Sequence, residues 1–503
     1  MSRDYEVAII GGGPNGLAAA AHLALSGADV VVLEGRFERG GTMASDDYST
    51  PFTYNQAQAA LPLGADNPVV ADLKLADRGM TFIEPDVAIE VITQDGIHVI
   101  GRGGDGLGDA VRAMFSSISR ACAPALYRPP EPEQPLIAGW RSRGESAAAD
   151  LADLTPALLA SLAGSEPARL ALRYACAASG FADPDERIGA VGGFMVARWF
   201  SPVLVAGGSK NLPNALFRIA ASAGAACHVS ARVTQVRRAD PGFRLSCAGG
   251  QQFGARNVIC TLDPCTTFTR LLDPALVPAE LAAAGRAWIF DDLASFIVHF
   301  GIVGLPPISG HGREPFLRLV GFNGVRDLDD HLAAVRSGRL PQRPGGMLSV
   351  TTAHDPLQAS PGPFGPLHTL RFDSFAPMSH PDGSWDRQRR GYRAECWRFL
   401  CEELPALRKA QLIAQFADAP GDLRRRFCTT GGGTVRQGAV SSAQALTLRP
   451  HPLCADTRTP VPGFYLGGGG VHPGVPGLLS AGMLATRAIE ADLGLANPAA
   501  ARQ

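Results

Sequence analysis

The first apolar segment lies close to the start of the chain and is interrupted by glycine. Residues 5–10 end in an uninterrupted apolar run that stops at Gly11. A short run of this kind, bounded by a glycine turn, is typical of a buried strand. Residues 17–26 are rich in alanine and predict a helix, and residues 28–33 form a second apolar run. A strand, a helix and a strand within about thirty residues predict a βαβ unit.

Two later regions repeat this alternation of apolar strands and helices. The first follows a glycine pair. It predicts a helix over residues 212–223, a strand over 231–238 with a hairpin that extends to 245, and a buried strand over 257–261. The second predicts a strand, a glycine run and a helix, over residues 463–466, 467–470 and 478–493. The stretches between them are less regular. We therefore expect one discontinuous domain with a second domain threaded through it.

Composition restricts the kind of protein. The chain has 503 residues, which is too long for one ordinary core. Hydrophobic residues make up 46% and charged residues 18%, a globular balance. The formal net charge is -1, so the sequence offers no concentrated basic surface, and we expect no nucleic-acid partner.

Cysteine spacing and hydropathy bear on metal binding and location. The ten cysteines contain no C-x-x-C motif, and the nearest pairs, such as Cys260 and Cys265, match no zinc spacing. We therefore expect no metal site and a reduced, cytoplasmic protein. No signal peptide precedes the first apolar run, and no uninterrupted stretch of about 18 apolar residues predicts a membrane-spanning helix.

A dinucleotide-binding motif follows the first predicted strand. Gly11, Gly13 and Gly16 form G-x-G-x-x-G between that strand and the next helix. These glycines permit a tight turn and a close approach of the backbone to a pyrophosphate, which the helix N-terminus stabilises. Glu34 ends the second strand about twenty residues later, where an acidic side chain accepts hydrogen bonds from a ribose. The combination predicts dinucleotide binding.

The residues after Glu34 point to FAD. The glycine pair Gly40 and Gly41 completes a segment that resembles the E-x4-5-GG extension of FAD-binding amine oxidases and carotenoid desaturases. In those families the glycines let the backbone pass close to the pyrophosphate, and a nearby arginine faces phosphate or flavin. Arg36 and Arg39 are both candidates for that arginine.

The middle of the chain resembles the same families. The segment 207–216 is similar to their G-G-x-x-x-L helix start, and residues 257–264 resemble the exit of their next strand. Val233 lies on the strand between, where the resemblance implies that backbone groups meet the adenine.

The C-terminal glycine run gives the most specific resemblance. Residues 462–477 are similar to the G-x-G-T-H-P-G segment of phytoene desaturases, which follows a strand and contacts the flavin. Two differences stand out: Val471 occupies a position where threonine is common, and the segment before Val475 is two residues shorter. We therefore expect a shorter loop over the flavin.

The resemblance implies an α/β fold with a Rossmann-type FAD-binding domain, of the amine oxidase and phytoene desaturase kind, and an interleaved α+β substrate domain. We assign residues 1–104, 205–272 and 425–503 to the first domain, and residues 105–204 and 273–424 to the second. FAD contacts are expected at Gly11, Gly13, Pro14, Asn15, Gly16, Glu34, Gly35, Arg36, Gly40, Gly41, Thr42, Val233, Gly468, Gly469, Gly474, Val475 and Pro476.

Other side chains have competing interpretations. His472, in the C-terminal segment, is a weak catalytic candidate and also suits a structural turn. The apolar run 194–205 suits core, a substrate channel or contact with a membrane surface. Tyr48 and Tyr54 suit either the substrate side or aromatic packing.

The predicted function is hydride transfer between a substrate carbon and flavin, most simply in a desaturase or dehydrogenase of a small, largely apolar isoprenoid or natural product. An amine or amino-acid oxidase, a saturase or isomerase using reduced FAD, and a flavin-free binding protein are the alternatives. Many flavin amine oxidases use a lysine near the flavin. Because the chain has only Lys74, Lys210 and Lys409, an amine oxidase is disfavoured. The sequence leaves the oligomeric state open.

Overall fold

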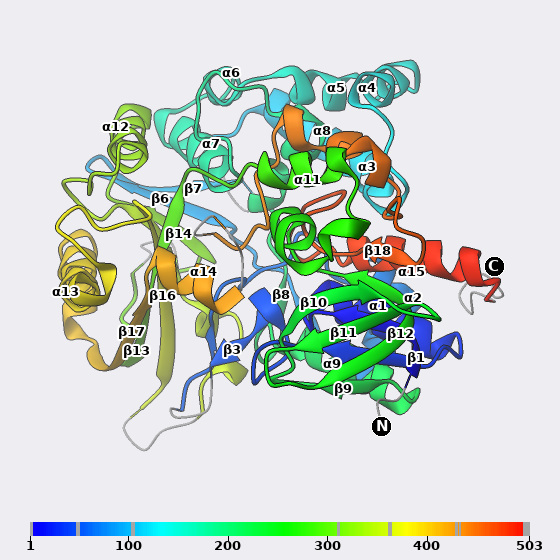
Figure 1. Cartoon of the computed structure of the whole chain (residues 1–503). Coiled ribbons are helices and arrows are strands. Elements are labelled where there is room, and N and C mark those ends of the chain that lie inside the picture. Colours follow the sequence, from blue (N-terminus) through cyan, green and yellow to red (C-terminus); the bar gives the residue numbers. More distant parts are fainter. Residues whose placement is uncertain are drawn as a thin grey trace.

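Two sheets of seven strands form the framework of the molecule (Figure 1). The structure is a computed structural model and describes residues 4–46, 51–101, 106–308, 312–360, 365–427, 431 and 434–495. The sheets stand apart, with a group of helices beside both (Figure 1).

The first sheet joins the three regular regions that the sequence predicts. Its path is β10-β11-β12-β1-β2-β9, with β18 added beside β12. The strands are β1 (Asp4–Ile10), β2 (Val30–Leu33), β9 (Ala226–His228), β10 (Val233–Arg238), β11 (Phe243–Cys247), β12 (Gln252–Cys260) and β18 (Phe464–Leu466). The strands β2, β9, β12 and β18 pair in parallel with their neighbours around β1. The predicted Rossmann-type βαβ core is therefore confirmed.

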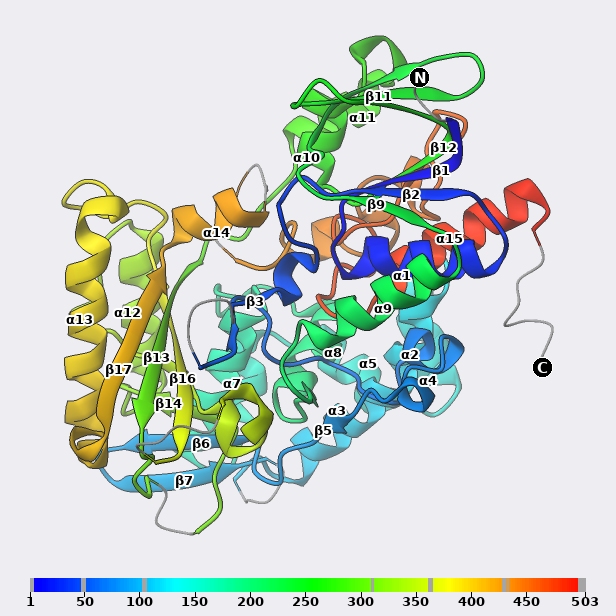
Figure 2. The same ribbon diagram turned by 90° about the horizontal axis from the view of Figure 1, so that it is seen from below.

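Three helices cover one face of this sheet. They are α1 (Pro14–Leu25), α9 (Asn211–Ser222) and α15 (Ser480–Leu493), and Figure 2 shows them in one layer. The alanine-rich face of α1 is buried, which lets the helices pack closely. Gly16 is required by this packing, because a Cβ there would lie 2.1 Å from the carbonyl oxygen of Gly11. The sequence thus holds the start of α1 against the end of β1.

The second sheet has the order β17-β13-β16-β15-β14-β6-β7, and α13 (Trp385–Glu403) lies along one of its faces (Figure 2). Its strands are β6 (Ile89–Thr93), β7 (Gly96–Ile100), β13 (Ala294–Val303), β14 (Leu317–Val320), β15 (Gly346–Ser349), β16 (Leu367–Ala376) and β17 (Gln411–Asp418). Apolar residues at alternate positions of β13 and β16, such as Phe296, Val298, Phe300, Leu370 and Phe372, give this sheet a core of its own.

The predicted boundary at residue 104 is wrong for two strands. We assigned residues 1–104 to the FAD-binding domain, yet β6 pairs in parallel with β14 and antiparallel with β7, in the second sheet. The apolar pattern of 89–100 predicts a strand pair but does not say which sheet it joins. The pairing partner is more than two hundred residues away in sequence.

A helical group completes the second domain. Its main members are α3 (Asp109–Cys122), α4 (Glu133–Ser142), α5 (Ser146–Asp153), α6 (Pro156–Ser161), α7 (Glu166–Ala178) and α8 (Gly189–Trp199). The apolar run 194–205 spans the end of α8 and the short strand β8 (Leu204–Val205), and none of its residues is exposed. The interpretation of this run as a membrane-contacting surface is therefore wrong, because its apolar side chains are already covered by protein.

The remaining elements are short or connect the two sheets. They are α2 (Pro68–Asp72), α10 (Pro264–Thr266), α11 (Ala279–Arg286), α12 (Val325–Arg336), α14 (Pro420–Phe427), β3 (Ser45–Asp46), β4 (Tyr54–Asn55) and β5 (Phe82–Ile83). Among the residues that the structure describes, no helix has the length and apolarity needed to cross a membrane.

Candidate active site

A long cavity runs over the carboxyl ends of β1, β2 and β12, where parallel strands of such sheets bind ligands. Its walls come from all three regions of the first sheet. They include all but one of the residues predicted to contact FAD: Gly11, Gly13, Pro14, Asn15, Gly16, Glu34, Gly35, Arg36, Gly41, Thr42, Val233, Gly468, Gly469, Gly474, Val475 and Pro476. We call this space the dinucleotide cavity.

Glu34 closes one end of the dinucleotide cavity. Its carboxylate accepts a hydrogen bond from the backbone N–H of Gly12 (2.7 Å) and another from that of Arg36 (2.7 Å). These bonds fix the carboxylate at the glycine turn, and each oxygen keeps a second lone pair. The residue therefore suits the expected role of accepting from ribose hydroxyls.

The structure separates the two arginines that follow Glu34. Arg36 lines the dinucleotide cavity and pairs with Glu38. The guanidinium carbon of Arg39 instead lies 3.7 Å from the centroid of the Phe217 ring, in a cation–π contact outside that cavity lining. Gly40 is the one expected contact that does not line the cavity; its N–H donates to the carbonyl of Gly12 (2.9 Å) and so supports the glycine turn from behind.

The C-terminal glycine run forms the opposite end of the cavity. It leaves β18, passes the carboxyl end of β12 and leads into α15. Gln437 holds it in place: its side-chain amide donates to the carbonyl of Thr261 (2.9 Å) and accepts from the N–H of Gly470 (3.1 Å). Backbone groups here and the nearby N-terminus of α15 suit the polar edge of a flavin ring.

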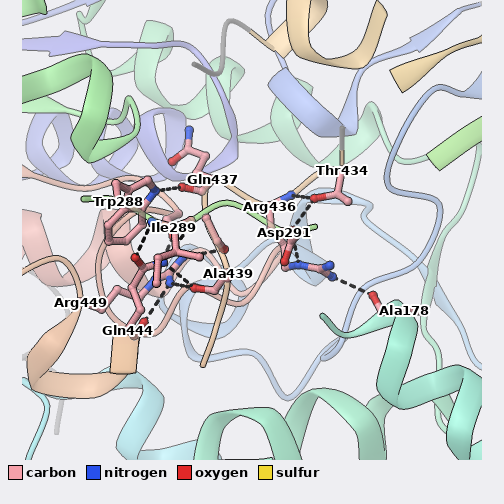
Figure 3. Close-up of polar contacts among 12 residues, drawn as sticks. Ala178, Trp288, Ile289, Asp291, Thr434, Arg436, Gln437, Ala439, Gln444 and Arg449 are labelled. Atoms are coloured by element: carbon pink, nitrogen blue, oxygen red, sulfur yellow. Dashed lines mark hydrogen bonds and ion pairs between the residues drawn. The ribbon is translucent and has the colours of Figure 1, made fainter. Parts of the chain in front are cut away.

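A buried arginine, Arg449, also holds the same run in place, and Figure 3 shows it beside Trp288. The guanidinium of Arg449 stacks on Trp288 and donates to the backbone carbonyl oxygens of Gly438, Ala439, Gln444 and Gly469. Burial lowers the pKa of Arg449 to about 9, with no ion-pair partner among the described residues. Hydrogen bonds to neutral carbonyls therefore hold the cation, and through it the position of the glycine run.

His472 lies away from both cavities. It is buried, and its Nε2 donates to the carbonyl of Ala125 (3.2 Å). Burial lowers the pKa of His472 to about 4, so the ring is neutral at ordinary pH. Because His472 does not line either cavity of the described residues, the geometry favours its structural interpretation over the catalytic one.

A second cavity adjoins the dinucleotide cavity, and we call it the substrate cavity. It lies between the second sheet and the helical group, and the two cavities share the walls formed by Val435, Arg436, Val475 and Pro476. Most of its lining is apolar, with Met195, Trp199, Leu293, Ile297, Phe316 and Phe375 among the larger side chains. Met195 and Trp199 show that the run 194–205 is partly core and partly channel wall.

Four charged side chains line the substrate cavity: Arg198, Arg371, Asp373 and Arg436. The carboxylate of Asp373 accepts two hydrogen bonds from Arg371, each 2.8 Å long. Burial raises the pKa of Tyr174, so its phenol stays protonated. Tyr54 packs edge-on against Phe416 and does not line the cavity, whereas Tyr48 lies outside the described residues.

Several cavity residues were not predicted from the sequence. Thr261, Arg426, Arg436 and Gln437 line the dinucleotide cavity, and Arg436 also reaches the substrate cavity. The polar segment 434–437, between a glycine run and the C-terminal motif, is the one local signal that could have drawn attention to them.

Comparison with known proteins supports a flavoprotein. The family model of flavin-containing amine oxidoreductases matches residues 152–301, and that of NAD(P)-binding Rossmann-like domains matches residues 9–73. A limonene dehydrogenase polypeptide of Castellaniella defragrans is 25% identical, over 98% of this chain and 96% of its own. The mouse pyridine nucleotide-disulfide oxidoreductase domain-containing protein 2 is 24% identical, over 98% of this chain and 94% of its own.

Solved structures share the fold. Putrescine oxidase has a TM-score of 0.62 at 16% identity, covering 98% of this chain and 100% of its own. Cyclohexylamine oxidase from Brevibacterium oxydans has a TM-score of 0.58 at 18% identity, covering 98% of this chain and 100% of its own. The predicted fold class and the predicted cofactor, FAD, are confirmed. The finer resemblance to phytoene desaturases stays a prediction.

Proposed function

We propose that this FAD-dependent oxidoreductase is a dehydrogenase that takes hydride from a carbon atom of a small, largely apolar substrate, such as an isoprenoid or a related natural product. The residues of the dinucleotide cavity hold FAD, with Glu34 at the ribose and the C-terminal glycine run at the flavin ring. The observation that carries the proposal is the apolar substrate cavity that meets the dinucleotide cavity at Val435, Arg436, Val475 and Pro476.

The charges of the substrate cavity favour carbon over nitrogen as the site of oxidation. An ammonium group entering it would meet three guanidinium groups, while the two nearby carboxylates, Asp373 and Asp291, already pair with Arg371 and Arg436. Like charges within one cavity repel most strongly where the dielectric constant is low. None of the three lysines lines either cavity, so the lysine typical of amine oxidases has no counterpart there.

The protein contributes orientation and a largely apolar environment. Bound FAD would supply the hydride acceptor. The cavity walls hold the substrate where the two cavities meet. Tyr174 stays protonated and Asp373 stays paired with Arg371, so neither is available as a strong base. We therefore expect the proton that leaves the neighbouring carbon to pass to solvent. The similarity to the limonene dehydrogenase polypeptide is consistent with a largely apolar substrate.

Anaerobic titration of the FAD-loaded protein tests this function. We expect limonene or allylic isoprenoid alcohols to bleach the long-wavelength flavin band, and cyclohexylamine and putrescine to leave it unchanged. Free FAD titrated with the same compounds is the control for direct reduction. Bleaching by the amines, with none by the isoprenoids, would assign the protein to the amine oxidases.

A further inference from the structure

Arg436 occupies the wall between the two cavities. Among the residues that the structure describes, both cavities share four, and Arg436 is the charged one. Arg436 is buried, with 8% of its surface exposed. Three contacts hold it (Figure 3). Nε donates to Asp291 (2.9 Å), Nη1 donates to the carbonyl of Ala178 (2.7 Å), and the backbone N–H donates to Thr434 (3.3 Å).

These contacts place the guanidinium head on the substrate side. Ala178 and Thr434 both line the substrate cavity and are absent from the lining of the dinucleotide cavity. Nη2, the third nitrogen of the guanidinium, has no hydrogen-bond partner among the described residues. A ligand oxygen that accepts from this nitrogen in a largely apolar cavity gains a hydrogen bond to a charged group.

The charge of Arg436 is already balanced. Asp291 is buried and pairs with it, and the hydroxyl of Thr434 donates to the same carboxylate oxygen (2.7 Å). A second carboxylate brought to Nη2 would therefore lie near Asp291 and be repelled. A carbonyl or hydroxyl oxygen gains the hydrogen bond without that repulsion.

We propose that Arg436 anchors the substrate through a neutral oxygen, so that the substrate is an oxygenated apolar molecule, a ketone or an alcohol, with its oxygen held beside the flavin-facing wall. Asp291, Thr434 and the carbonyl of Ala178 are positioning groups, because they fix the guanidinium before the substrate arrives. The proposal rests on the proposed function in taking this cavity as the substrate site.

Binding of rigid probes tests the proposal without turnover. Adamantane, adamantanone and adamantane carboxylate share one cage, and its bridged carbons do not form a C=C bond. Their affinities for the oxidised, FAD-loaded protein can be measured by equilibrium dialysis. The measured quantity is the ratio of the affinity for adamantanone to the affinity for adamantane. We expect this ratio to be at least about ten times larger in the wild type than in Arg436→Met, because a hydrogen bond to a charged group contributes at least that factor in affinity.

Matched variants separate anchoring from folding. Arg198→Met removes another arginine from the same cavity and should leave the preference unchanged. Arg436→Met combined with Asp291→Asn avoids leaving a buried carboxylate unpaired, and should lose the preference as the single variant does. Asp291→Asn alone frees the charge of Arg436 and should raise the affinity for the carboxylate probe about tenfold or more.

Three results would overturn the proposal. They are a wild type that binds adamantanone no better than both Arg436 variants do, a preference that depends on Arg198, and an unchanged carboxylate affinity in Asp291→Asn. Because probe binding needs no flavin reduction, the two proposals fail separately. Failure of isoprenoids to bleach the flavin, with the probe preference intact, would contradict only the proposed function.

Discussion

Individual polar side chains around the cavities have two different roles. Some, such as Glu34, present atoms to the space where a ligand lies, while others, such as His472 and Arg449, hold backbone that does so. The difference is visible in their hydrogen bonds. Glu34 accepts from two backbone N–H groups and still has lone pairs free. The guanidinium of Arg449 instead donates its hydrogen bonds to backbone carbonyl oxygens.

Glu34→Ala should weaken FAD binding. It removes the acceptor for the ribose and leaves the N–H groups of Gly12 and Arg36 without their partner. A hydrogen bond to a charged group is worth roughly 1.5–3 kcal/mol, which is about tenfold to over a hundredfold in affinity. Titration of the apoprotein, followed by flavin fluorescence, measures this. Glu6→Gln is the control, because Glu6 also accepts a hydrogen bond from a backbone N–H in the same βαβ unit but does not line the cavity. Equal FAD affinity in Glu34→Ala and Glu6→Gln would exclude Glu34 from the ribose.

His472 makes folding sensitive to acid. Its pKa is about 4 in the folded protein and near 6.5 when exposed, so between these values the unfolded chain binds more protons. The free energy of unfolding therefore falls as the pH drops from 6.5 to 4, by about 3 kcal/mol for this one group. Above pH 6.5 the effect is absent.

The variant His472→Gln keeps a donor for the carbonyl of Ala125 but cannot be protonated. Its thermal midpoint should fall less between pH 7 and pH 5 than that of the wild type. His98→Gln, which replaces a partly exposed histidine, should retain the wild-type pH dependence. If His472→Gln shows the full wild-type loss, its ring is not the buried neutral group that the structure describes.

At the scale of elements, the C-terminal glycine run depends on a support that is distant in sequence from the βαβ core. Gln437 and Arg449 come from the segment before β18, and together they hold the loop that follows it. Gly474 is the residue of this loop that leaves no room for a side chain beside Arg449. It has φ +80°, and a Cβ there would lie 2.3 Å from Nε of Arg449.

Gly474→Ala should therefore weaken FAD binding and lower the thermal midpoint. The substitution adds backbone strain of about 1–2 kcal/mol at positive φ, and in addition it displaces Arg449 or the loop. Gly494→Ala is a matched control, because Gly494 also has a positive φ but has open space around its Cβ position. Comparable losses of FAD affinity in the two variants would mean that the contact with Arg449 does not position the loop.

At the scale of the whole molecule, the chain crosses between its two sheets several times. The pair β6 and β7 lies in the first hundred residues but completes the second sheet beside β14. An ion pair joins β6 to β14. Glu90 on β6 and Arg318 on β14 are both buried, and the distance between Oε2 of Glu90 and Nε of Arg318 is 2.6 Å. The substrate domain is therefore incomplete without a strand pair from the N-terminal region.

Glu90→Gln tests this connection. Removing one charge of a buried pair costs about 3–5 kcal/mol when the other charge is left uncompensated. Arg318 keeps a second partner, the partly buried Glu314, so the loss should fall below that range. The thermal midpoint should fall, and substrate-side binding should be lost before FAD is released. Asp292→Asn breaks an exposed pair with Arg336 and should change the stability by less than about 1 kcal/mol. Two variants of equal stability would show that the β6–β14 pairing does not depend on this ion pair.

The sequence by itself determined the elements whose geometry depends on neighbouring residues. The apolar run before Gly11, the glycine turn and the alanine-rich helix follow from local rules, and so does the position of Glu34 at the end of β2. Because a dinucleotide site of this kind is built largely from backbone turns, the glycine spacing and the family resemblance predicted contacts of which all but Gly40 line the cavity. Side chains from other segments, such as Arg426 and Gln437, were not predicted.

Only the tertiary structure decided which distant segments meet. Strands 89–100 joined the second sheet because their edge pairs with β14, a contact that no local pattern encodes. Arg436 became a candidate anchor because folding brings it beside Asp291 and Ala178, far from it in sequence. The two arginines after Glu34 are equivalent in the sequence, and only in the folded chain does Arg39 pack against Phe217, outside the cavity lining. A site built from side chains of many segments depends on the whole fold. A site built from one backbone turn depends mainly on the residues of that turn.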